Sequence, residues 1–105
     1  MTRHKFKAQP AMRGDRRFDS QLEAKYFDYL TSLQLGGSVV FFLRQVPFHL
    51  PGRTRYVVDF QVFWADGRVE FIDVKGMETE LFKVKKRQVE EIYPVDIILA
   101  KKGTF

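Results

Sequence analysis

The stretch that most constrains the fold runs from residue 56 to residue 76 and reads YVVDFQVFWADGRVEFIDVKG. Two runs rich in Val, Phe and Ile flank residues 65–67 (ADG), a pattern typical of a β-hairpin. Both faces of this hairpin are apolar, which predicts that it lies at the buried centre of a sheet. Each run carries one acid, Asp59 and Asp73, so the turn decides whether the two charges meet.

The length of the turn sets the register of the hairpin, because a shift of one residue moves every side chain to the other face. A two-residue loop points the two acids to opposite faces. A three-residue loop, which ends with Gly67 in the left-handed region, places Asp59 directly opposite Asp73. Lys75 then lies on the same face as both acids, because alternate residues of a strand share a side.

Two directly opposed carboxylates repel each other, and a divalent cation between them removes the conflict. Asp59 and Asp73 offer the hard oxygen ligands that Mg²⁺ takes, and Mg²⁺ usually completes its shell with water and substrate phosphate. Lys75 can orient a metal-activated water or stabilise charge that develops on a phosphate. The hairpin therefore predicts a site suited to phosphodiester hydrolysis. The alternative is a structural Asp/Lys ion pair of little energetic weight.

The composition indicates one small globular domain. The chain has 105 residues, of which 45% are hydrophobic, and a net charge of +5. It has no cysteine, which excludes disulfides and thiolate zinc sites and favours a reducing cytoplasm. We expect neither a signal peptide nor a membrane span.

The basic residues are clustered, which fits a polyanion such as nucleic acid and predicts salt-dependent affinity. Residues 1–17 predict a flexible basic N-terminal arm, although basic termini can also serve solubility alone. The residues that we expect to contact phosphates are Arg13, Arg16, Arg17, Lys83, Lys85, Lys86 and Arg87.

A helix is expected from Ser20, which matches a capping box with Glu23, to the stop at residues 36–37. Glu23 has two interpretations. As a capping residue it would satisfy a backbone N–H at the start of the helix. Its place on the apolar stripe with Phe27 and Leu30 would instead aim it inward. The sequence supports both about equally.

The remaining elements complete an α/β fold. Residues 38–46 predict a strand that ends at Pro47, with residues 48–50 as a candidate extension of its pairing. A second helix is expected over 79–92, and a last strand over 95–100 should run parallel to the Asp73 strand through a right-handed crossover. The order α-β-β-β-α-β gives a mixed sheet with a central hairpin flanked by helices. Residues expected on the inner face of the second helix are Leu81, Phe82, Val89, Ile92 and Tyr93.

Glu23 on a first helix, Asp59 in the first hairpin strand and residues 73–75 (DVK) in the next resemble the PD-(D/E)xK nuclease superfamily. The element order is similar to that superfamily's restriction-endonuclease-like core. The chain also resembles small phage-encoded proteins of unassigned function that carry the motifs FDSxLEAKY and DGRVExxDVKG. This second likeness covers residues 18–94, and it implies a single nuclease-like domain over 18–105.

The resemblance implies a metal-dependent endodeoxyribonuclease that uses Mg²⁺ or Mn²⁺. Asp59, Asp73, the backbone carbonyl of Val74 and Glu23 would be ligands or water-positioning groups, and Lys75 would be the catalytic lysine. The chain departs from the pattern at Val58, where proline is usual. It also departs at Asp73, where a glutamate one methylene longer is usual, so the position and number of metals stay open.

Several functions are compatible with this resemblance. One is structure-specific cleavage of branched or junction DNA in phage DNA processing, inside a bacterial host, by a monomer or a homodimer. The alternative is a non-catalytic DNA-binding accessory protein that keeps the nuclease fold. A third is a scaffold protein that is indifferent to nucleic acid.

Overall fold

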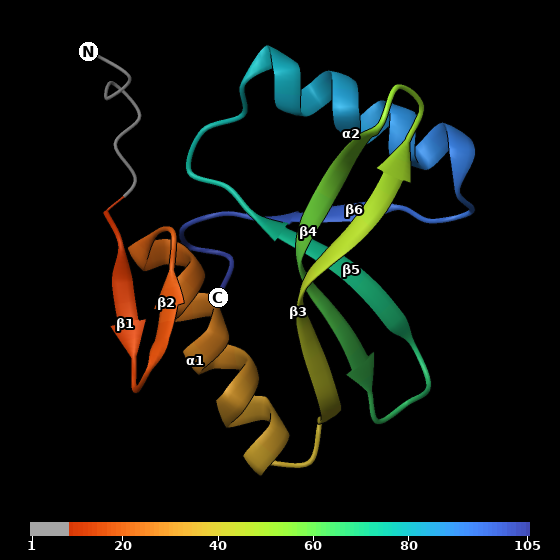
Figure 1. Ribbon diagram of the computed structural model, residues 1–105. Helices are drawn as coiled ribbons and strands as arrows, with labels where there is room; N and C mark the ends of the chain where they lie inside the picture. Colours follow the sequence, from red (N-terminus) through yellow and green to blue (C-terminus); the bar gives the residue numbers. More distant parts are fainter. Residues whose placement is uncertain (1–8) are drawn as a thin grey trace.

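A computed structural model describes residues 9–105. Its elements in chain order are β1 (Ala11–Arg13), β2 (Arg16–Phe18), α1 (Gln21–Leu35), β3 (Val39–Leu50), β4 (Thr54–Trp64), β5 (Val69–Val74), α2 (Glu80–Ile92) and β6 (Ile97–Ala100). The main sheet has the order β3-β4-β5-β6, with β5 and β6 parallel and the other neighbours antiparallel (Figure 1). The predicted α/β class, the order α-β-β-β-α-β from α1 onwards and the parallel last strand are confirmed.

The central hairpin has the three-residue loop. Phe63 pairs with Val69, and the Trp64 N–H donates to the Arg68 carbonyl at 2.9 Å. Gly67 has φ +95°, the left-handed value that this turn requires. The register brings Asp59 opposite Asp73, as predicted.

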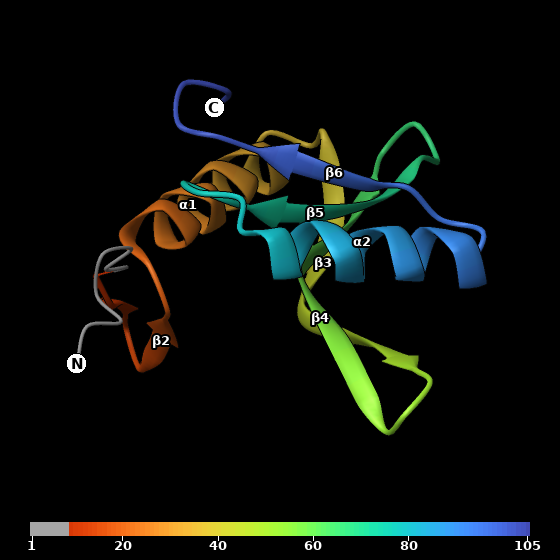
Figure 2. The same ribbon diagram turned by 90° about the horizontal axis from the view of Figure 1, so that it is seen from above.

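Strand β4 serves two hydrophobic clusters. Phe60 packs with Tyr26 and Leu30 of α1, whereas Val58 packs with Phe82 and Val89 of α2. Alternate residues of a regular strand share one face, so β4 must twist sharply between Val58 and Phe60. Figure 2 shows the outer half of the β3–β4 hairpin turning away from β5. Asp59 lies between Val58 and Phe60.

Strand β3 differs from the prediction because it runs without a break through Pro47, which pairs with Val57. Proline lacks a backbone N–H and is tolerated on edge strands, and β3 is an edge of this sheet. The chain reverses instead at residues 51–53. The β3–β4 hairpin is therefore longer than predicted.

The expected N-terminal arm needs a correction. Residues 1–8 lie outside the described residues, but Ala11 and Phe18 pair in a short β1–β2 hairpin. Phe18 is fully buried, and the Arg13 guanidinium donates to both carboxylate oxygens of Asp28 on α1 at 2.8 to 3.0 Å. These contacts fix residues 11–18 against α1, so this part of the arm is structured.

Helix α2 buries a narrower face than predicted. Phe82 and Val89 are buried, but Leu81 is 65% exposed and Ile92 is 51% exposed.

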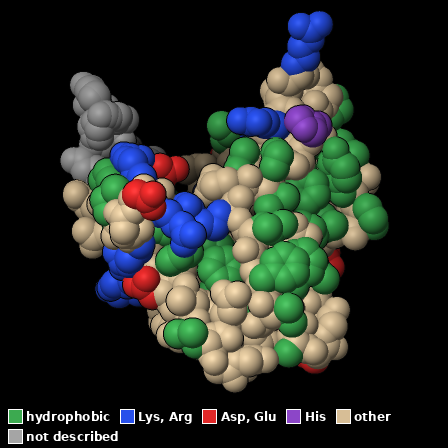
Figure 3. Space-filling view, turned by 60° about the horizontal axis from the view of Figure 1, so that its bottom comes forward, with side chains coloured by type: hydrophobic (Ala, Val, Ile, Leu, Met, Phe, Trp, Pro, Cys, Tyr) green, Lys and Arg blue, Asp and Glu red, His purple; other side chains and the backbone are tan. Residues whose placement is uncertain are grey.

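Exposed hydrophobic side chains gather on one face of the molecule, beside a group of Lys and Arg side chains (Figure 3). Neither helix within residues 9–105 is long and apolar enough to cross a lipid bilayer.

Candidate active site

Asp59 and Asp73 lie where β4 and β5 separate, and each carboxylate binds the backbone of the opposite strand. The Asp59 N–H donates to Asp73 Oδ1 at 2.9 Å, and the Val74 N–H donates to Asp59 Oδ2 at 2.9 Å. These two side-chain contacts follow directly after the last regular pair, Phe60 with Ile72. They hold the two acids side by side at the end of the hairpin.

Asp73 is the more buried of the two acids, with 2% of its surface exposed. Its Oδ2 accepts a hydrogen bond from the Tyr56 hydroxyl. Burial raises the pKa of Asp73 above its usual range, and the charges of Lys75 and Lys86 oppose this rise. Burial also raises the pKa of Asp59, while the Val74 N–H and the Lys75 charge lower it. A positive charge at this site would therefore relieve both groups.

Lys75 follows β5 directly, and its charge lowers the pKa of both acids. Its Nζ lies over the Phe82 ring, 4.6 Å from the ring centre. A cation over an aromatic face is held by the ring quadrupole. Phe82 on α2 thus helps to position the ammonium group that the sequence predicted for catalysis.

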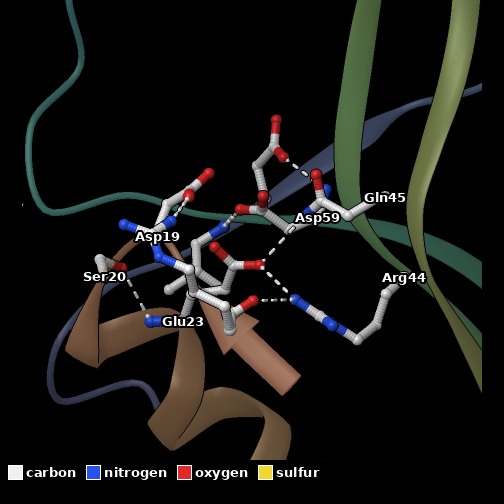
Figure 4. Close-up of polar contacts among 9 residues, drawn as sticks. Asp19, Ser20, Glu23, Arg44, Gln45 and Asp59 are labelled. Carbon is white, nitrogen blue, oxygen red and sulfur yellow. Dashed lines mark hydrogen bonds and ion pairs between the residues drawn. The ribbon is translucent and has the colours of Figure 1, made fainter. Parts of the chain in front are cut away.

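Glu23 points inward, which decides between its two interpretations. Only 4% of the residue is exposed. Its Oε2 accepts from Gln45 Nε2 at 3.0 Å and lies 3.6 Å from Arg44 Nη2 (Figure 4). Burial, followed by the charge of Asp59, raises the pKa of Glu23 to about 7. The N-cap itself is made by Ser20, whose Oγ accepts the Glu23 N–H at 3.0 Å.

Sequence reasoning missed three residues of this site. Tyr56 contacts Asp73, Gln45 contacts Glu23, and the Arg44 guanidinium lies 3.9 Å from the centre of the Phe18 ring beside Glu23. Tyr56 lies three positions before Asp59 on β4, but nothing in the pattern distinguishes it from a core aromatic residue. Gln45 and Arg44 are adjacent on β3, and the left-handed φ of Gln45 (+55°) interrupts the alternation that would otherwise point them to opposite faces.

The acidic side chains fit Mg²⁺ by their chemistry, although they are not assembled as a cage. Within residues 9–105, no three His, Cys, Asp or Glu side chains form a group that could hold a metal ion as they stand. Asp59 and Asp73 nevertheless supply carboxylate oxygens with further lone pairs, and Glu23 is close enough for the Asp59 charge to affect its pKa. The Val74 N–H donates to Asp59 Oδ2, and the Val74 carbonyl remains a predicted metal ligand.

Most of the predicted phosphate-binding residues have acidic or aromatic partners. Arg13 binds Asp28, Arg17 lies 3.1 Å from Asp19, and Lys83 lies 3.4 Å from Glu80. Arg16 lies over the Phe27 ring, and Lys85 is half-buried. Arg87 is exposed. These residues form two groups, one on the β1–β2 hairpin and one on α2.

Lys86, which the sequence predicted to contact phosphates, is not fully exposed. It is half-buried, and its Nζ lies 2.9 Å from Glu90 Oε2. Glu90 also accepts the N–H of Ile97 at 2.8 Å, which ties α2 to β6. Because Lys86 also lowers the pKa of Asp73, it contributes positive potential to the candidate site.

The fold and the site define a mixed α/β protein with buried acids at a strand junction. Residues 3–100 match the family described as "Protein of unknown function (DUF1064)", and the chain belongs to this family. No curated protein matches the chain, and no solved structure matches it.

Proposed function

We propose that this protein is a metal-dependent endonuclease of the PD-(D/E)xK type that hydrolyses phosphodiester bonds of DNA. The observation that carries the proposal is the placement of Asp59 and Asp73 at one strand junction, with the Lys75 charge acting on both. Glu23 adds a third acid from α1. This combination matches the requirements of phosphodiester hydrolysis better than those of a simple ion pair.

In this proposal Asp59, Asp73 and Glu23 would hold Mg²⁺ or Mn²⁺, which when bound supplies an activated water and a Lewis acid for the phosphate. Lys75 stabilises the charge that develops on the phosphate oxygens, and Phe82 keeps its ammonium group in place. Tyr56 holds the Asp73 carboxylate by donating its hydroxyl proton. The basic groups on α2 and on the β1–β2 hairpin bind the DNA backbone without reading bases. A homodimer is the form that would cut both strands of a duplex or a branched substrate.

A cleavage assay with Lys75→Ala tests this proposal. Branched, single-stranded and duplex DNA are incubated with Mg²⁺ or Mn²⁺ and the wild-type or variant protein. We expect Lys75→Ala to slow cleavage by at least about 100-fold, because it removes a charge from the reacting phosphate. Lys102→Ala, which removes an exposed lysine outside the site, is the matched control and should cut normally.

The same assay separates the proposal from its rival. Wild-type protein that binds DNA but cuts none of the substrates would favour the non-catalytic accessory protein. Cutting that survives Lys75→Ala would come from a contaminating nuclease. An absence of binding even at low salt would indicate a protein indifferent to nucleic acid.

The phosphate contacts make a separate prediction about Arg87 and Arg13. Because Arg87 is exposed on α2, Arg87→Ala should weaken binding to all DNA sequences alike and reduce the salt slope by about 1. Arg13 is held by Asp28, so Arg13→Ala should chiefly loosen the β1–β2 hairpin. Titrations of fluorescent DNA over a range of salt concentrations, with a melting curve for each variant, check both expectations. An unchanged salt slope for Arg87→Ala would remove this residue from the interface.

A further inference from the structure

The outer part of the β3–β4 hairpin, residues 46–58, is a two-stranded ribbon that projects from the main sheet. Strand β5 pairs only with residues 60–63 of β4, whereas β3 pairs with β4 up to the turn between them. Figure 2 shows this outer ribbon extending beyond the rest of the molecule. Its buried side packs on α2 through Tyr56, and the Tyr93 hydroxyl donates to the His49 carbonyl at 2.7 Å. These contacts hold the outer ribbon in one direction.

The turn at the end of the outer ribbon carries an arginine in an unfavourable backbone conformation. Arg53 has φ +59°, in the left-handed region that glycine and asparagine adopt more readily than arginine. Gly52 beside it has φ +81°, so two successive residues of the turn are left-handed. Strained residues of this kind cluster at active sites and ligand-binding sites. The conformation of the turn therefore gives no reason for an arginine at this position.

The exposed side of the outer ribbon is basic. The outer ribbon includes His49, Arg53 and Arg55 but neither aspartate nor glutamate, and all three side chains are exposed. His49 and Arg55 lie directly opposite each other on the two strands, so their side chains share one side. Among residues 9–105, neither arginine pairs with an acid, in contrast to most of the residues predicted to contact phosphates. Both charges are therefore open to an external anion.

Strand β4 leads from these charges to the candidate active site. Arg55 and Asp59 are four residues apart on β4, and buried residues alternate with more exposed ones between them, so both lie on the same side of the strand. Four residues of extended strand place Arg55 about 13 Å from Asp59, and Arg53 lies farther out. The major groove of B-DNA is about 12 Å wide and admits a two-stranded β-ribbon. A duplex with one phosphate at Asp59 would therefore present phosphates of its other strand to the two arginines.

We infer that the outer ribbon enters the major groove of duplex DNA, where Arg53 and Arg55 bind phosphates of the strand that is not at the candidate active site. This inference rests on the proposed function, because it takes Asp59 as the place of the reacting phosphate. The contact is additional to those proposed for α2 and the β1–β2 hairpin. It positions the duplex without reading its bases. Because it needs both strands, it favours duplex over single-stranded DNA.

The double variant Arg53→Asn/Arg55→Thr tests the inference. Its affinity for a blunt DNA duplex should fall about tenfold, because two charged contacts are lost. The dependence of log affinity on log salt concentration should become less steep by about 2. Affinity for each single strand of the same duplex should change by less than about twofold. Fluorescence anisotropy in EDTA, which prevents metal-dependent cleavage, measures all three quantities.

Lys25→Asn/Lys102→Thr is the matched control, because it removes the same charge from two exposed side chains. Lys25 lies on α1 two residues after Glu23, and therefore on the opposite side of the helix from the candidate site. Lys102 lies beyond the end of β6. The control should bind the duplex as tightly as the wild type.

The single variant Arg53→Asn separates binding from folding. Asparagine suits the left-handed position, so this variant should melt at the wild-type temperature or above it while it binds the duplex more weakly. A lower melting temperature with unchanged binding would make Arg53 a structural residue of the turn and overturn its proposed role.

Two results with the double variant would also overturn the inference. One is unchanged affinity for the duplex, and the other is an equal loss of affinity for the single strands. Cleavage assays on the same proteins distinguish this inference from the proposed function. Wild-type protein that cuts the duplex while the double variant binds it equally well would refute the contact of the outer ribbon alone. Wild-type protein that binds the duplex through the outer ribbon but cuts no DNA would contradict the proposed function alone.

Discussion

Replacing Asp73 by asparagine is expected to abolish Mg²⁺-dependent DNA cleavage while the protein stays folded. A bound metal contributes several kcal/mol to the transition state, and each 1.36 kcal/mol is a tenfold change in rate. Loss of one of its ligands should therefore slow cleavage by at least about 1,000-fold. The measurement is the rate of cutting of a labelled branched DNA under single-turnover conditions.

The fold should survive this change because asparagine can keep both contacts of Asp73. Its amide oxygen can accept the Asp59 N–H, and its NH₂ group can donate to the Tyr56 hydroxyl, which also accepts hydrogen bonds. Burial already disfavours the charged form of Asp73 and raises its pKa. In EDTA, Asp73→Asn should therefore melt at the wild-type temperature or above it.

Asp96→Asn provides the control for this prediction, since Asp96 is exposed just before β6. It should cut DNA at the wild-type rate. Cleavage by Asp73→Asn within tenfold of the wild-type rate would show that Asp73 holds no catalytic metal. A folded Asp73→Asn protein that neither cuts DNA nor binds Mn²⁺ is the outcome that the proposed site requires.

The core of the site could be predicted because local rules determine it. Gly67 fixes the turn, the turn fixes the register, and the register places Asp59 opposite Asp73. The inward orientation of Glu23 was one of two interpretations, and its position on the apolar face of α1 indicated the correct one. Each of these steps depends on residues close together in sequence or on one strand pair.

The parts that sequence reasoning missed depend on long-range packing. Gln45 and Arg44 both approach Glu23 although they are adjacent on β3, because Gln45 has a left-handed backbone, and no periodicity in β3 encodes that irregularity. Pro47 continues a strand because β3 is an edge, which is a property of the whole sheet.

The β1–β2 hairpin also depends on contacts distant in sequence. Its strands have three residues each, and burial of Phe18 and the contact of Arg13 with Asp28 hold them. Short basic strands of this kind carry little pattern of their own, so the segment resembled a flexible arm. The contacts that order it become visible only once α1 is in place beside it.

Replacing Glu23 by glutamine is expected to stabilise the protein at pH 8 and to change it little at pH 5. The pKa of Glu23 rises from 4.5 to about 7 on folding, so the folded state binds more protons between these values. Stability from this group is therefore lost as pH rises from about 4.5 to about 7, and at pH 8 the ionised side chain costs about 3 kcal/mol. Glutamine removes that cost but leaves Arg44 without its anion, so we expect a net gain of about 1 to 2 kcal/mol.

Urea unfolding in EDTA at pH 5 and pH 8 measures this difference. Glu80→Gln, on the exposed first turn of α2, is the control, and its free energy of unfolding should change between pH 5 and pH 8 as much as that of the wild type. Equal destabilisation of Glu23→Gln at both pH values would mean that Glu23 is a structural partner of Arg44 and carries no excess charge cost. The expected gain at pH 8 would show that the ionised Glu23 carboxylate destabilises the folded protein. Arg44 and Gln45 already contact this carboxylate, yet its pKa is still raised. Of the partners proposed for Glu23, a bound cation is then the one that would stabilise its charge.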